Sequence, residues 1–252
     1  MVSRREFLGS AGVLAATAWF STIPGSATSA AEVYATQASA TATDPTLLAR
    51  ARALLQEVPF IDTHNDLPSM LLTVEGGLAT HDLSKVQPTL CADIPRLREG
   101  CVGAQYWSVF VESATQRTHT SLHEAMREFD VALRLIRSQP AFEQARTADD
   151  IERIHKSGRI ACLMGVEGGH MIENSPASLR MFYELGARYM TLTHWDNIDW
   201  ADSATDRPQN YGLTGFGKQV VREMNRLGMF VDISHVGADT MRDALSFSRA
   251  PV

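Results

Sequence analysis

Apolar and polar residues follow two periods along this chain, one typical of buried strands and one typical of amphipathic helices. Short runs of apolar, β-branched and aromatic residues predict five strands, over residues 58–61, 102–111, 160–166, 188–193 and 230–233. Apolar positions three and four residues apart predict helices over about 45–55, 121–136, 150–156, 175–186, 214–227 and 238–246. Strands that alternate with helices imply a parallel sheet, because parallel strands need a crossover connection.

The predicted helix ends carry residues that helices prefer there. Pro45 stands in a first turn and Ser175 precedes Pro176, which opens the fourth helix. Ser121 and Glu124 have the spacing of a capping box, in which each side chain bonds to the other residue's backbone. These signals support the helix boundaries.

The α/β pattern leaves two architectures open, a doubly wound sheet and a (β/α)₈ barrel of TIM type. A closed barrel needs eight strand–helix units, whereas the pattern shows five or so. Pro251 and Val252 stand where a sixth strand is expected to begin. As a barrel, the chain is expected to hold the N-terminal units only, with the C-terminal part missing.

Composition narrows the class of protein. An apolar content of 44% and a charged content of 21% are ordinary for a globular protein. A formal net charge of −6, without a block of lysine or arginine, argues against a nucleic-acid partner. Cys162 lies in an apolar strand and is expected to be a buried thiol, while a Cys91–Cys101 disulfide after export is left open.

The N-terminus has the form of an export signal. Ser3-Arg4-Arg5-Glu6-Phe7-Leu8 is a twin-arginine pattern, and the apolar run 11–20 that follows is too short to span a bilayer. We expect residues 1–31 to be a twin-arginine signal peptide, 32–44 a disordered lead-in and 45–252 the barrel domain. The expected partner is the twin-arginine translocation machinery, and the expected location is the periplasm or outside the cell. The alternative is a chance basic start before a short core helix.

Four predicted strands end on side chains of the kind that bind metals. His64 and Asp66 are one residue apart, so at a strand end both side chains face the same side. Glu167, His194 and His235 follow three further strands. Imidazole with carboxylate suits zinc or another divalent first-row metal. Each residue alone could instead be a solvated or ion-paired rim residue, so the metal hypothesis depends on all four strand ends together.

Other polar residues lie near these positions. His170 follows two glycines after Glu167 and is expected to support the site or lie at the surface. Asp232 lies on the last strand and could orient a neighbour. A long polar and aromatic loop, residues 195–206, follows His194, and loops of that length on a compact domain are often functional.

At this level of detail the sequence resembles the membrane dipeptidase (renal dipeptidase) family, zinc-dependent peptidases of the amidohydrolase-like group. The matching stretches cover nearly all of residues 55–252: IDTHNDLP (61–68), DIPRLREGCVGAQYWSVFV (93–111), GVEGGH (165–170), YMTLTHWDNIDWADSATD (189–206) and GLTGFGKQVVREMNRLGMFVDISHVG (212–237). The resemblance implies a (β/α)₈ barrel with two zinc ions at its C-terminal face.

The resemblance also implies a role for each candidate residue. His64 and Asp66 would bind the first zinc, Glu167 would bridge both ions and His235 would bind the second. His194 would contact the scissile carbonyl or the tetrahedral intermediate. Glu167 and His194 would be the catalytic residues in hydrolysis of a dipeptide by metal-activated water. A homodimer is left open.

The family has a further histidine for the second zinc, an arginine and an aspartate downstream, and none has a counterpart here. The chain as written is therefore expected to hold the second ion weakly, to be poorly soluble because of open sheet edges, and to be nearly inactive. Two alternatives stay open: another amidohydrolase-type metal hydrolase, acting on lactones or acyl-amino acids, and a non-catalytic truncated relic.

Overall fold

The computed structural model describes residues 45–252, and the predictions for residues 1–31 and 32–44 lie outside the described residues. All strands of the described part fall within the unit Ala49–Val252. The first described helix, α3 (Pro45–Glu57), begins at the proline that predicted it. Among residues 45–252, the structure contains no helix with the length and apolar character that a membrane span requires.

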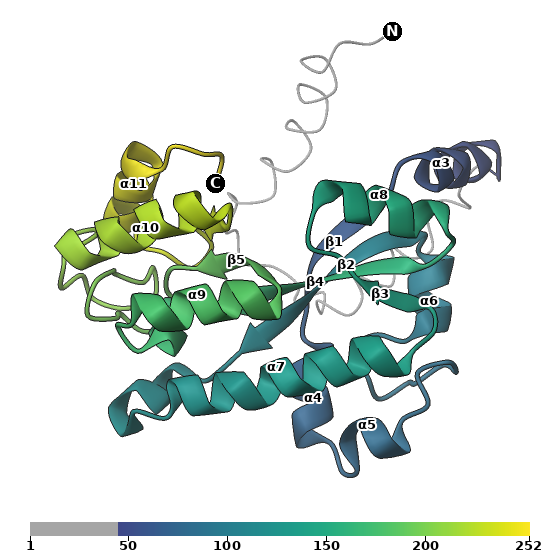
Figure 1. Ribbon diagram of the computed structural model, residues 1–252, viewed down its shortest axis with the longest axis horizontal. Coiled ribbons are helices and arrows are strands. Elements are labelled where there is room, and N and C mark those ends of the chain that lie inside the picture. Colours follow the sequence, from purple (N-terminus) through teal and green to yellow (C-terminus); the bar gives the residue numbers. More distant parts are fainter. Residues whose placement is uncertain (1–44) are drawn as a thin grey trace, which may run out of the picture. The chain divides into compact units, whose positions relative to one another are not determined.

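The described strands form one parallel sheet in the order β1-β2-β4-β5-β6, with β3 paired to β4 off this path (Figure 1). Their bounds are β1 (Phe60–Asn65), β2 (Val102–Phe110), β3 (Phe142–Gln144), β4 (Ile160–Glu167), β5 (Ala187–Thr191) and β6 (Phe230–Asp232). The short strand β3 was not predicted. The other five agree with the predicted strands within a few residues.

The sheet is curled. In strand order β2 and β4 separate β1 from β5, yet Nδ1 of His64 on β1 lies 3.1 Å from the hydroxyl of Tyr189 on β5. In a flat sheet, strands three positions apart would be about 14 Å apart, because neighbours are spaced by about 4.8 Å. An open doubly wound sheet would not bring these side chains together. The fold is therefore an α/β half-barrel, which confirms the prediction of a partial TIM-type barrel.

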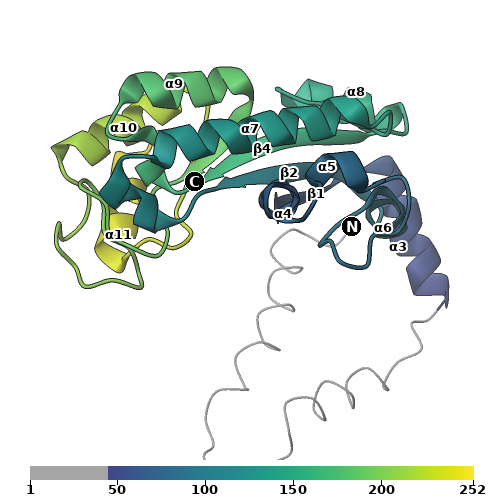
Figure 2. The same ribbon diagram turned by 90° about the horizontal axis from the view of Figure 1, so that it is seen from below.

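Helices α7 and α9 lie next to each other on the outer face of this half-barrel (Figure 2), whereas α8 contributes Ile151 and Ile154 to the cluster on the inner face. The bounds are α4 (Leu67–Thr73), α5 (Gly77–Thr80), α6 (Ile94–Glu99), η1 (Ser113–Thr118), α7 (Ser121–Ser138), α8 (Ala148–Lys156), η2 (Gly169–Ile172), α9 (Pro176–Leu185), α10 (Gly215–Leu227) and α11 (Ala238–Phe247). Ser175 caps α9 as its sequence predicted, because its hydroxyl accepts from the backbone N–H of Ser178. The short elements α4, α5, α6, η1 and η2 were not predicted.

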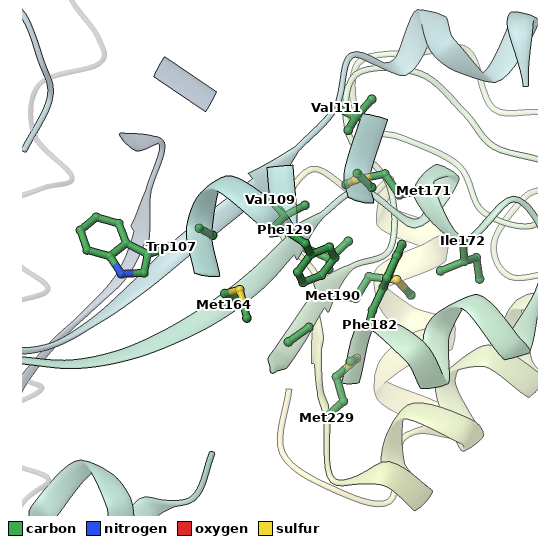
Figure 3. Close-up of a cluster of buried hydrophobic side chains, with 14 of the residues drawn as sticks. Trp107, Val109, Val111, Phe129, Met164, Met171, Ile172, Phe182, Met190 and Met229 are labelled. Carbon is green, nitrogen blue, oxygen red and sulfur yellow. The ribbon is translucent and has the colours of Figure 1, made fainter. Parts of the chain in front are cut away.

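Alternate residues of each strand face two separate apolar clusters. Trp107 of β2 and Met164 of β4 face the helices, where the rings of Phe129 and Phe182 pack 5.0 Å apart (Figure 3). The inner cluster comprises Ala104, Tyr106, Ala145, Ile151, Ile154, Ala161, Leu163 and Tyr189. On the inner face, the apolar cluster therefore lies toward the amino ends of β2 and β4, and the polar side chains lie at their carboxyl ends.

One local expectation, the capping box at Ser121, differs from the structure. The helix α7 begins at Ser121, so its N-cap is Thr120, and the Thr120 hydroxyl bonds to that of Thr118 at 2.8 Å and makes no cap. The Ser121 hydroxyl bonds to that of Thr115 at 2.7 Å. The predicted capping box is therefore wrong. Cys91 and Cys101 are free thiols in the structure, and Cys162 is buried as expected.

Candidate metal site

The five predicted site residues all lie at the carboxyl edge of the parallel sheet. His64 is the penultimate residue of β1, and Asp66 directly follows that strand at the N-cap of α4. Glu167 is the last residue of β4, while His194 and His235 each lie three residues beyond a strand end. Parallel strands present their carboxyl ends on one edge, and the curl then brings these side chains together.

Glu167 stands at the centre of the site. Its Oε2 lies 3.4 Å from Nε2 of His64, and its Oε1 lies 3.3 Å from Nε2 of His235. Nε2 of His194 lies 3.6 Å from Oε1 as well. The two oxygens of one carboxylate therefore face two different sets of ligands.

Two groups of candidate ligands result, and they share Glu167. The first group is His64, Asp66 and Glu167, and the second is Glu167, His194 and His235. Within each group the candidate ligand atoms all lie within 4.8 Å of one another. Each group could hold a metal ion.

The first group is open to solvent and strongly charged. Nε2 of His64 donates to Oδ1 of Asp66 at 3.1 Å, and the side chain of Asp66 is 55% exposed. Hydrogen bonds to Asp66 and then to Glu167 raise the pKa of His64 to about 10, although burial opposes them. The same bond to His64 is the main cause that lowers the pKa of Asp66. Without an ion, an imidazolium therefore holds the two carboxylates together.

The second group is more enclosed. The side chain of His194 is only 6% exposed, and its ring lies 4.7 Å from Phe110, 4.9 Å from Trp195 and 4.4 Å from His235, measured between centroids. Burial is the main cause that lowers the pKa of His194, with Glu167 opposing and His235 adding to the effect. His194 is therefore neutral near pH 7, and its buried Nδ1 has no hydrogen-bond partner among the described residues.

Backbone geometry beside the site is unusual at two positions. His235 has a φ of 63°, in the left-handed region that few non-glycine residues adopt. Gly168, directly after Glu167, has a φ of 135°, which only glycine adopts without strain. Left-handed residues often cluster at functional sites, where the surrounding structure holds them in place.

Two polar residues near the site, Tyr189 and Ser108, have contacts that the sequence did not predict. The hydroxyl of Tyr189 contacts His64, and that of Ser108 donates to Oε2 of Glu167 at 3.5 Å. The carboxylate of Asp232 accepts from the hydroxyl of Thr191 at 2.5 Å and from that of Ser234 at 2.7 Å, so it orients these two neighbours. The period-two pattern places Ser108 and Tyr189 within strands, but nothing local in the sequence shows which ligand each one meets.

His170 belongs to neither group. It is 5% exposed, so the expectation of a surface position is wrong. Its Nε2 donates to the backbone carbonyl of Val111 at 2.9 Å, and burial is the main cause that lowers its pKa to about 4. His170 is therefore a neutral, buried residue that ties the loop after β4 to the end of β2.

Glu128 of α7 lies behind the first group and is only 1% exposed. Its carboxyl bonds to the hydroxyl of Ser69 in α4 and accepts from the backbone N–H of Phe110 at 2.9 Å. Burial raises the pKa of Glu128 to about 8, and the negative charges of Asp66 and Glu167 act in the same direction. A neutral carboxyl therefore joins α4, which begins at Asp66, to the end of β2.

The donor set fits a divalent first-row metal. Imidazole nitrogens with carboxylate oxygens are the ligands that zinc takes in hydrolytic sites. Three candidate donors in each group leave room for water or substrate, as a catalytic site requires. In the first group, His64 must give up one proton before its Nε2 can bind an ion.

Comparison with known proteins identifies relatives of this chain. The family described as membrane dipeptidase (peptidase family M19) matches residues 48–252. Dipeptidase 3 of Rattus norvegicus is 39% identical over 218 residues, and Dipeptidase 3 of Homo sapiens is 40% identical over 215 residues. These alignments cover 83% and 82% of this chain but only 43% and 42% of the relatives. The chain thus spans less than half the length of these curated relatives.

Solved structures share the fold. A metallopeptidase from Rhodobacter sphaeroides, liganded with a phosphinate mimic of the dipeptide L-Ala-D-Ala, matches with a TM-score of 0.66 at 23% identity. The match covers 77% of this chain and 63% of that one. An amidohydrolase from Pseudomonas aeruginosa matches with a TM-score of 0.62 at 23% identity, over 80% of this chain and 54% of that one.

Proposed function

The chain belongs to the membrane dipeptidase family, and from that premise we propose that the protein hydrolyses dipeptides at a binuclear zinc site. His64 and Asp66 hold one ion in this proposal, His235 holds the other and Glu167 bridges both. The observation that carries the proposal is the position of Glu167, whose Oε2 faces His64 and whose Oε1 faces His235.

The chain's own residues divide the work of the reaction. Bound zinc would polarise the scissile carbonyl and lower the pKa of the attacking water. Glu167 would set the spacing of the site and neutralise part of its charge. Asp66 would balance charge at the exposed side of the site.

His194 takes the substrate side of the site. Burial keeps its imidazole neutral, so one ring nitrogen carries a proton that can be donated to the carbonyl oxygen as negative charge develops there. The rings of Phe110 and Trp195 on either side restrict its orientation. Fixed donors of this kind stabilise a transition state without reorganising.

The test has two levels, zinc binding and turnover. Purified protein is stripped with a chelator, titrated with zinc and assayed for hydrolysis of L,L and L,D dipeptides. The proposal predicts zinc-dependent release of free amino acids, which is slow in the chain as written because the second ion is held weakly. Release no faster than that by Glu167→Gln would contradict dipeptide hydrolysis. Turnover of lactones or acyl-amino acids in place of dipeptides would favour another amidohydrolase-type hydrolase. Zinc binding without turnover of any of these substrates would favour a non-catalytic relic.

We also propose export by the twin-arginine pathway to the periplasm or beyond. The support is the Ser3-Arg4-Arg5-Glu6-Phe7-Leu8 pattern and the apolar run after it. Replacement of Arg4 and Arg5 by lysine should retain a reporter fused to residues 1–44 inside the cell. Unchanged export of that variant would contradict the proposal.

A further inference from the structure

Tyr189 is a buried side chain that touches a proposed metal ligand but has no part in the chemistry above. It lies on β5 and is 9% exposed. Its hydroxyl lies 3.1 Å from Nδ1 of His64, which is 125 residues away in sequence and on β1. The contact crosses the hollow of the half-barrel and joins two strands that do not pair with each other.

The position of this ring is fixed on both sides. Gly165 on β4 is the sheet partner of Tyr189, and a Cβ on Gly165 would collide with the tyrosine ring. Tyr106 of β2 packs against the ring with centroids 5.3 Å apart. Gly165 therefore leaves room for the ring of Tyr189, and the packing on both sides fixes the position of its hydroxyl.

The direction of the hydrogen bond follows from the other ring nitrogen. Nε2 of His64 faces Oδ1 of Asp66 at 3.1 Å and Oε2 of Glu167 at 3.4 Å. Nε2 is therefore the nitrogen that would bind an ion together with these carboxylates. Nδ1 must then carry the proton, so it donates to the tyrosine oxygen. Histidine ligands of metals commonly donate their second N–H in this way, which fixes the tautomer and the ring orientation.

We propose that Tyr189 is a positioning residue for the metal site, which accepts the Nδ1–H hydrogen bond of His64 and so holds Nε2 toward Asp66 and Glu167. The metal-binding consequence rests on the proposed function, whereas the orientation of the ring does not. Tyr106 provides a matched control, because it is equally buried and its hydroxyl makes no hydrogen bond within residues 45–252.

The experiment compares Tyr189→Phe with Tyr106→Phe, both in a His235→Ala background, in which the first group keeps all three of its candidate ligands. Zinc affinity is measured by competition with a chromophoric chelator. The Tyr189→Phe change should weaken zinc binding about 10- to 100-fold, and Tyr106→Phe should leave it unchanged. Equal affinity in the two variants would overturn the proposal.

A metal-free readout separates this inference from the proposed function. In protein labelled with ¹⁵N-histidine, the slowly exchanging Nδ1 proton of His64 should be visible in the parent and in Tyr106→Phe, and lost in Tyr189→Phe. Its persistence in Tyr189→Phe would overturn the proposal even if zinc binding changed. If the parent bound no zinc, the proposed function would fail, and this resonance alone would decide whether Tyr189 holds the ring. Urea unfolding of the metal-free variants tests for a purely structural effect. Such an effect would lower the stability of Tyr189→Phe but leave the Nδ1 proton resonance of His64 in place.

Discussion

The two sides of the candidate site share one carboxylate but differ in how they are held. On the β1 side, His64 and Asp66 are exposed, and charge orders them: the neighbouring carboxylates raise the pKa of His64 to about 10. On the β5–β6 side, packing orders the site: His194 is buried among aromatic rings, and burial lowers its pKa. The same Glu167 thus faces an imidazolium on one side and a neutral imidazole on the other.

The difference indicates a division of labour. The open side is accessible to solvent, while the packed side keeps the imidazole of His194 neutral and restricts its orientation. Exposed charge pairs are weak and are screened by salt. The orientation of His64 on the β1 side therefore depends also on its bond to Tyr189 and on the packing of α4, whereas aromatic packing orients His194 on the other side.

The largest effect on zinc affinity and turnover is expected from Glu167→Gln, because both sides of the site share Glu167. Glu167→Gln removes the negative charge that faces His64 and His235, so both groups should lose zinc affinity together. Turnover should fall by at least about 1000-fold, equivalent to roughly 4 kcal/mol of transition-state stabilisation. Steady-state kinetics with saturating zinc provide the measurement, and Glu173→Gln, at an exposed glutamate outside both groups, is the control. A Glu167→Gln enzyme with the wild-type kcat would contradict the bridging role.

Support of the β1 side by Glu128 gives a pH dependence of stability. Its folded pKa of about 8 lies above the ordinary value of 4.5, so the folded state holds a proton that the unfolded state releases between these values. The free energy of unfolding should therefore fall as pH rises from about 4.5 to 8, by up to roughly 1.4 kcal/mol per pH unit from this group. The loss is complete above pH 8.

Glu128→Gln should remove this pH dependence, because the amide can donate to Ser69 and accept from the N–H of Phe110 without a charge. Urea unfolding at several pH values between 5 and 8.5 measures the difference. Glu128→Ala, which leaves both partners unsatisfied, should be destabilised at every pH by about 1–3 kcal/mol. Parallel pH profiles for wild type and Glu128→Gln would show that Glu128 is not protonated in the folded protein.

A smaller effect is expected from Gly165→Ala, which acts on the β1 side alone. The added methyl group would displace the Tyr189 ring, so stability should fall by about 1–3 kcal/mol and zinc affinity of the first group by about tenfold. Gly215→Ala is the matched control, because a Cβ at Gly215 meets nothing within 4 Å. Chelator competition and urea unfolding measure both quantities. Equal behaviour of the two variants would show that the ring has room to move.

The last prediction needs no mutation and concerns the protonation states of His64 and His194. In metal-free protein near pH 7, ¹⁵N chemical shifts should show His64 protonated on both nitrogens and His194 neutral, since their pKa values are shifted in opposite directions. Two histidines with the same protonation state at this pH would remove the contrast between the two sides.

The sequence could predict the strand ends because local patterns determine them. Apolar runs mark β1, β4 and β5, and the positions of His64, Glu167 and His194 follow from where these runs stop. The capping box at Ser121 failed because α7 begins at Ser121, which places Thr120 and not Ser121 at the N-cap. Short elements such as α4 and β3 were missed because they have too few residues to show a period.

The supports of the site could not be predicted in the same way. Tyr189 and His64 meet only because the sheet curls, and the curl is a property of all the strands together. Glu128 looks like a surface residue of an amphipathic helix until α4 covers it. Long-range contacts of this kind leave no local signal in a single sequence.

The central claim is that Glu167 joins two ion sites, and zinc stoichiometry tests it most directly. Wild type, His64→Ala, His235→Ala and Glu167→Gln are titrated with zinc, and bound metal is counted by native mass spectrometry. We predict one tightly and one weakly bound ion for wild type, only the weak ion for His64→Ala, only the tight ion for His235→Ala and none for Glu167→Gln. Bound zinc in Glu167→Gln equal to that in wild type would contradict the claim.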